Sequence, residues 1–124
     1  MRVGIDYWNT ISHNVETFTD LARALLAAGH EVHIVTAVGH VRKKTVRADI
    51  EALDIPHTDV HVVIFDHPRE APTRKYAVCK AVGITLFFDD RMDTCEYLNE
   101  RSIVACNVLR RRADTARVSA AGNM

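Results

Sequence analysis

Short apolar runs alternate along this chain with stretches in which apolar residues have helical spacing. The apolar runs cover residues 2–6, 31–36, 60–66, 84–89 and 102–106. Between them, apolar side chains recur every three or four positions, which is the period of an amphipathic helix. We therefore expect five strands that alternate with helices near residues 15–28, 42–55, 73–82 and 93–99.

The strand-like runs are almost continuously apolar and show little alternation of polar and apolar positions. Strands of this kind are covered on both faces, as in parallel sheets flanked by helices. The connections are short and each carries a helix, which favours right-handed crossovers between parallel strands. The pattern predicts an α/β fold with a five-stranded parallel sheet.

The length of 124 residues fits one domain with a single core. We assign residues 1–108 to this domain. Residues 109–124 contain four arginines and end in small residues, so we expect a basic, flexible C-terminal tail there.

The composition excludes several classes of function. Sixteen basic and sixteen acidic residues give a net charge of zero, so nucleic-acid binding is not indicated. The three cysteines are far apart and form no CxxC pair, which argues against a disulfide framework and a zinc site. No run approaches the roughly 18 apolar residues of a membrane span. We expect a cytoplasmic protein without a membrane partner.

Carboxylates follow two of the apolar runs. Asp6 ends the first run, and Asp89 ends the fourth with Asp90 directly after it. In a parallel sheet these side chains would meet at the carboxyl edge of the strands, where open α/β proteins bind ligands. Carboxylates gathered there repel one another unless a cation lies among them, and their oxygens suit Mg²⁺. The sequence therefore predicts a metal site at this edge.

A hydroxyl and a lysine complete a set that suits phosphoryl transfer. Thr36 ends the second run, and Lys75 lies near the start of the helix before the fourth. Asp6 can attack a phosphorus atom, while Thr36 and Lys75 hold the phosphoryl oxygens and the bound metal neutralises charge. We expect Asp6, Thr36 and Lys75 to be catalytic residues.

The order of these parts resembles that of the haloacid dehalogenase-like (HAD) superfamily. The first motif of that family, a strand followed by D-x-D-x-T, is matched at Asp6 and Thr10. Its second motif is a strand that ends in Thr or Ser, as at Thr36. Its third is a single lysine, for which Lys75 fits better than Lys80.

The fourth family motif, a strand that ends in DD or D-x-x-x-D, is matched by Asp89, Asp90 and Asp93. Asp93 is equally suited to cap the following helix. The resemblance covers residues 2–106 and implies a Rossmann-like three-layer sandwich and Mg²⁺ dependence. It also implies phosphomonoester hydrolysis through a phospho-aspartate on Asp6.

Trp8 departs from the first motif. In family phosphatases this position holds a second aspartate, which protonates the leaving group and then activates water. An indole cannot do this work, and such a loss costs about 10²–10⁴ in rate. The resemblance still implies that the backbone carbonyl of Trp8 binds the metal. We expect a phosphohydrolase of low activity; the alternative is a catalytically silent module that binds phosphate or a partner protein.

The links around the site are too short to hold a cap domain. About eight residues separate Asp6 from the first helix. An open rim suits a large phosphorylated substrate, such as a macromolecule, or a neighbouring subunit of a homo-oligomer that closes the site. The aromatic ring of Trp8 can either stack on a ligand or block the mouth of the site. A receiver-like signalling domain is a third reading, because it also uses acids, Thr and Lys on a parallel sheet.

Overall fold

Five parallel strands form the centre of the computed structural model, which describes residues 1–110. Residues 111–124, and with them most of the expected tail, lie outside the described part. The strands are β1 (Arg2–Ile5), β2 (Glu31–Val38), β3 (Asp59–Ile64), β4 (Leu86–Asp89) and β5 (Val104–Asn107). The helices are α1 (Val15–Ala27), α2 (Val46–Ala52), α3 (Ala71–Val82) and α4 (Met92–Asn99), with short helical turns η1 (Tyr7–Ile11), η2 (Arg42–Lys44) and η3 (Pro68–Glu70).

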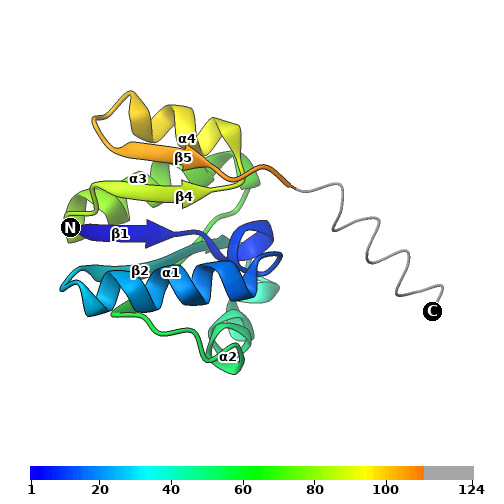
Figure 1. Cartoon of the computed structure of the whole chain (residues 1–124). Coiled ribbons are helices and arrows are strands. Elements are labelled where there is room, and N and C mark those ends of the chain that lie inside the picture. The colour runs from blue at the N-terminus through cyan, green and yellow to red at the C-terminus, as the bar shows by residue number, and fades with distance from the viewer. Residues whose placement is uncertain (111–124) are drawn as a thin grey trace.

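The strand order is β3-β2-β1-β4-β5, and every neighbouring pair is parallel. Figure 1 shows β1, β4 and β5 side by side. Strands β2 and β3 follow β1 on one side of it, and β4 and β5 lie on the other side of β1. The order therefore reverses between β1 and β4, where doubly wound sheets open a ligand crevice. The receiver-like reading is wrong, because that fold places β1 between β2 and β3.

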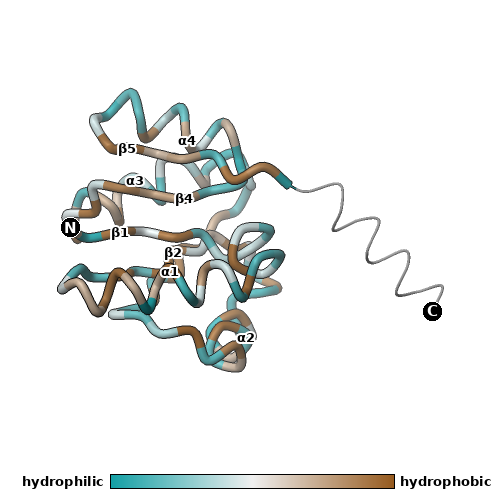
Figure 2. Tube along the Cα trace, viewed as in Figure 1, coloured by the Kyte–Doolittle hydropathy of each residue, from teal (hydrophilic) through white to brown (hydrophobic). Residues whose placement is uncertain are grey.

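Helices cover both faces of the sheet, as the continuous apolar strands predict. Adjacent residues of one strand point to opposite faces. Thus Ile34 packs with Phe18 of α1 and Ile50 of α2 in one buried cluster, while Val35 belongs to a second cluster with Leu98 of α4. Figure 2 shows apolar residues along the strands between these helices. The predicted three-layer α/β sandwich is confirmed.

Several boundaries differ from the sequence-based expectation. The second helix is divided, because the basic residues 42–44 form the separate turn η2 before α2. Helix α3 begins at Ala71, earlier than expected, since Pro72 is tolerated in the first turn of a helix. The stretch expected to be a loop at residues 7–13 contains the turn η1. Among the described residues, no helix has the length and apolar character needed to cross a membrane.

Candidate metal and phosphate site

Three aspartates meet at the reversal point of the sheet. Asp6 directly follows β1, and its backbone N–H donates to the carbonyl of Phe88 in β4 at 2.9 Å. This bond extends the pairing of β1 with β4 by one step and places Asp6 beside Asp89. One carboxylate oxygen from each of Asp6, Asp89 and Asp90 lies within 4.8 Å of the others. The sequence-based expectation that these acids share one edge is confirmed.

Lys75 bridges two of the acids from the second turn of α3. Its Nζ donates to Oδ1 of Asp6 at 2.7 Å and to Oδ2 of Asp89 at 2.7 Å. The side chains of all three residues are buried, with exposures of 3% for Lys75, 6% for Asp6 and 0% for Asp89. Lys80 is exposed on the same helix, so the choice of Lys75 over Lys80 agrees with the geometry.

Burial and charge shift the proton affinities of this cluster. Burial raises the pKa of Asp6 to about 7, against the attraction of Lys75, and the charges of Asp89 and Asp90 add to the rise. Burial lowers the pKa of Lys75, but Asp6 and Asp89 raise it more, so it lies above its ordinary value. Lys75 therefore stays charged. Its single positive charge is too small to neutralise the three carboxylates of Asp6, Asp89 and Asp90.

The turn η1 holds the other oxygen of Asp6. The hydroxyl of Thr10 donates to Oδ2 of Asp6 at 3.0 Å, and it lies 3.5 Å from Oδ1 of Asp90. The backbone N–H of Ile11 donates to the Asp6 carbonyl, and the side-chain amide of Asn14 donates to the Thr10 carbonyl, so both bonds fix the turn. Its reversal passes through Asn9 at φ 61°, a left-handed conformation that asparagine tolerates. Thr10 is the threonine of the D-x-D-x-T pattern, so that pattern already pointed to it.

Thr36 is buried and makes no hydrogen bond to the acids in the described part of the chain. It lies two residues before the end of β2 rather than at the end, and its hydroxyl has no hydrogen-bond partner among the described residues. Ile34 pairs with Ile5, so Thr36 lies further along the sheet toward the same edge as Asp6. A buried hydroxyl without a partner costs free energy, which a ligand oxygen would recover.

Two neighbouring side chains contact the ring of Trp8. The guanidinium of Arg42, in η2, lies 4.6 Å from the centroid of its ring, and the Tyr7 ring meets it edge-on at 4.9 Å. The indole Nε1 is buried and has no hydrogen-bond partner in the described part of the chain. Because Arg42 covers one face of the ring, that face is not available for stacking on a ligand.

Asn107 and Arg110, which the sequence did not mark as site residues, hydrogen-bond to Asp89 and Asp90. The amide of Asn107, at the end of β5, donates to the backbone carbonyls of Asp89 and Asp90 at 3.3 and 3.1 Å. Arg110 donates from Nε to Oδ2 of Asp90 at 2.9 Å. No sequence signal marks them, because their role depends on β5 lying next to β4.

Asp93 lies outside the acidic cluster. Its carboxylate accepts bonds from the guanidinium of Arg91 at 2.7 and 3.1 Å and from the backbone N–H of Thr94 at 2.8 Å. These partners bring it into the first turn of α4, and they hold its pKa below the ordinary value despite burial. The N-cap of α4 is Arg91, which makes no side-chain capping bond, so the expected capping role of Asp93 is wrong; Asp93 is an acid within the first turn that pairs with Arg91.

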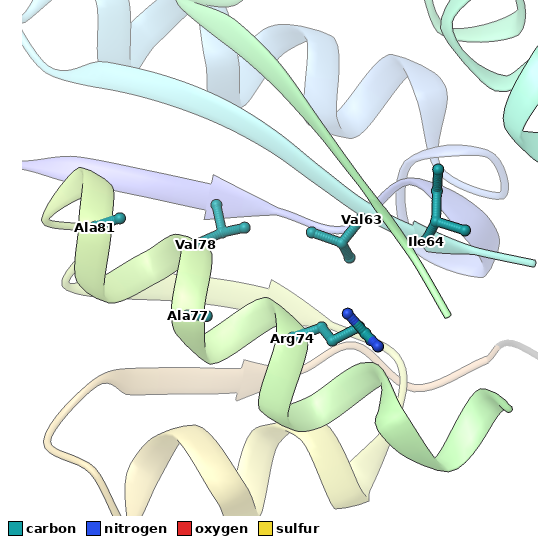
Figure 3. A pocket seen from close by; sticks show the side chains of 6 residues that line it. All are labelled: Val63, Ile64, Arg74, Ala77, Val78 and Ala81. Atoms are coloured by element: carbon teal, nitrogen blue, oxygen red, sulfur yellow. The ribbon is translucent and has the colours of Figure 1, made fainter. Parts of the chain in front are cut away.

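A groove of about 370 Å³ lies elsewhere, between β3 and α3 (Figure 3). Its only charged lining residue is Arg74, which also pairs with Glu70 at 3.3 Å. The remaining lining offers no group for acid–base or metal chemistry, so the carboxylate cluster is the better candidate site. The other lining residues are Val63, Ile64, Ala77, Val78 and Ala81.

Comparisons of the chain with protein-family models, curated proteins and solved structures give no match.

Proposed function

We propose that this chain is a capless, Mg²⁺-dependent phosphohydrolase of the HAD-like type that acts on phosphomonoesters. The observation that carries the proposal is the buried Asp6–Lys75–Asp89 cluster, with Asp90 beside it, at the reversal point of the strand order. Asp6, Thr36, Lys75 and Asp89 also occur along the chain in the order of the HAD motifs.

The acidic cluster suits Mg²⁺ in its chemistry. Asp6, Asp89 and Asp90 offer hard oxygen ligands within 4.8 Å of one another, and Lys75 supplies only one positive charge among them. In the resemblance, the backbone carbonyl of Trp8 is a further ligand. When bound, Mg²⁺ would neutralise charge on the phosphoryl oxygens and so favour attack by an anion.

Asp6 is the proposed nucleophile. One of its carboxylate oxygens forms a bond to phosphorus as the bond between phosphorus and the ester oxygen breaks, which leaves an acyl phosphate on Asp6. Water then attacks this phosphorus, so that phosphate leaves and the carboxylate is restored. Lys75 favours the ionised, attacking form of Asp6 through its bond to Oδ1. The unpartnered hydroxyl of Thr36 is the proposed donor to a phosphoryl oxygen.

Turnover is expected to be slow because the indole of Trp8 can neither protonate the leaving alkoxide nor accept a proton from the attacking water, so both protons are exchanged with bulk water. The proposed substrates are therefore esters whose leaving groups need little protonation, since the missing acid matters least for them. The site has no cap, so a phosphorylated macromolecule or a neighbouring subunit would cover it. We place the protein in the cytoplasm, where its three free cysteines, Cys79, Cys95 and Cys106, stay reduced.

The test is hydrolysis of a panel of phosphomonoesters by the purified chain with MgCl₂. We expect slow release of phosphate that EDTA stops and that Asp6→Asn abolishes, with circular dichroism to show that the variant is folded. Activity that survives Asp6→Asn would come from a contaminant or another site, and it would refute Asp6 as the nucleophile.

A catalytically silent module that binds phosphate is the second candidate. The contacts of Trp8 with Arg42 and Tyr7 favour this silent module. Trp8 stands where the motif has its second aspartate, and these contacts hold its ring as part of the turn η1. Trp8→Asp separates the two candidates. Activity that appears only in Trp8→Asp indicates a retained but silent site, whereas a native activity that rises about 10²-fold indicates a slow enzyme.

A further inference from the structure

The positive charge supplied by Lys75 does not balance the three acids, and a second cation meets them from outside. Arg110 donates from Nε to Oδ2 of Asp90 at 2.9 Å. The Asp90 side chain is 3% exposed, whereas that of Arg110 is 65% exposed. Lys75 is thus a fixed internal cation of the cluster, and Arg110 is a peripheral one.

The backbone before Arg110 brings it to this position. The N–H of Val108 donates to the carbonyl of Asp89 at 2.8 Å, which extends the pairing of β5 with β4. The amide of Asn107 bonds to the carbonyl of Asp90 at 3.1 Å. The chain therefore leaves the sheet directly beside the acids, and Arg110 reaches Asp90 as a consequence of strand pairing.

Arg110 and a metal ion would compete for the same carboxylate. A guanidinium bonded to Oδ2 of Asp90 puts positive charge on one of the three acids that would hold a cation, and like charges so close repel strongly in a partly buried site. Arg110 is largely in solvent, so its side chain can turn away at little cost. Lys75 cannot leave in this way, because it is buried between Asp6 and Asp89.

We propose that Arg110 is a displaceable counter-ion of the metal site, which holds Asp90 in the absence of metal and leaves it when a divalent cation binds. Arg110 thereby lowers the metal affinity of the cluster. This inference rests on the metal site of the proposed function, but it does not depend on turnover.

Isothermal titration of the full chain with MgCl₂ tests it. We expect Arg110→Gln to bind Mg²⁺ about fivefold more tightly than the wild type, the size of one partly exposed ion pair. Arg23→Gln is the matched control, because Arg23 is 68% exposed and pairs with Asp20 on α1 at 3.2 Å. That variant loses the same charge away from the acids and should bind as the wild type does.

The outcomes separate the two proposals. Unchanged or weaker binding in Arg110→Gln, while the wild type binds Mg²⁺, would overturn the role of Arg110 and leave the metal site intact. No binding by any of the three proteins would overturn the metal site and this inference with it. In a second measurement, the ¹⁵N resonance of Arg110 Nε should move when Mg²⁺ is added to the wild type, and an unmoved resonance would also count against displacement.

Discussion

Replacing Lys75 by methionine should destabilise the fold strongly at neutral pH. Lys75 is 3% exposed and holds Asp6 and Asp89 at 2.7 Å each. Methionine has a similar length and no charge, so it fills the space but leaves buried carboxylates facing one another. The expected loss in the free energy of unfolding measures how far the cluster depends on Lys75, its buried cation.

The magnitude follows from the geometry. With an effective dielectric constant of about 20, Coulomb's law gives about 6 kcal/mol for each pair at 2.7 Å. Loss of the desolvation cost of Lys75 and proton uptake by the acids left behind offset most of this attraction. Removing one partner of a buried pair typically costs about 3–5 kcal/mol, and we expect a loss of that size. For a domain of this size, that lowers the Tm by about 15 °C.

The loss should depend on pH. Burial already raises the pKa of Asp6 to about 7, far above its unfolded value of 3.8, and removal of Lys75 raises it further. A folded-state pKa above the unfolded one means that the folded protein takes up a proton, so stability falls as the pH rises through that range. Lys75→Met should therefore lose less at pH 5 than at pH 7.5.

Urea unfolding followed by circular dichroism, in EDTA at both pH values, measures the effect. Lys80→Met is the matched control, because Lys80 is exposed on the same helix and should change the free energy of unfolding by less than about 0.5 kcal/mol. A loss below about 1 kcal/mol for Lys75→Met at pH 7.5, or an equal loss at both pH values, would refute the buried ion cluster.

Two further predictions concern the sheet that carries the site. Gly4→Ala should cost about 2–3 kcal/mol in urea unfolding, since a Cβ there would lie 2.5 Å from the fully buried ring of Phe87. Gly39→Ala, whose Cβ would meet Phe65 at an ordinary 3.6 Å, is the control, and equal effects of the two would contradict the close approach of β1 to β4. The second prediction is that His61→Gln flattens the decline of stability as the pH falls below 6.5. Burial and the neighbouring His33 and Arg47 lower the pKa of His61 against the pull of Asp59, so the unfolded chain takes up the proton first. A Tm that falls as steeply between pH 7.5 and 5.5 in His61→Gln as in the wild type would show that His61 is not the source.

The sequence predicted the fold class because each strand carries its own apolar signal. Ile34 and Val35 are both apolar because helices cover both faces of β2. This apolar run can be recognised in the sequence without knowing which strands lie beside β2. The strand order is not visible in this way, because an apolar run does not specify its partner. The split of the second helix was missed for a related reason, as residues 42–44 suit a helix or a short turn equally well.

The site was predictable only for residues that lie at ends of strands or in ordered motifs. Asp6 and Asp89 follow from the rule that parallel strands share an edge, and Lys75 follows from its place near the start of a helix. The contacts of Arg110 with Asp90 and of Arg42 with Trp8 join segments that are 20 and 34 residues apart. Such contacts arise from the strand order and the loop paths, which local patterns do not encode.

The acidic cluster is expensive for the fold, and this cost supports a role in binding. Buried ion pairs are often no more stabilising than apolar side chains of the same volume. Here the balance is worse, because Asp6, Asp89 and Asp90 outnumber the buried cation, and burial raises the pKa of Asp6 to about 7. A site selected for stability alone would carry one acid for Lys75. An excess of carboxylates makes physical sense where a further cation completes the set, as Arg110 does from outside and as Mg²⁺ would do in the proposed enzyme.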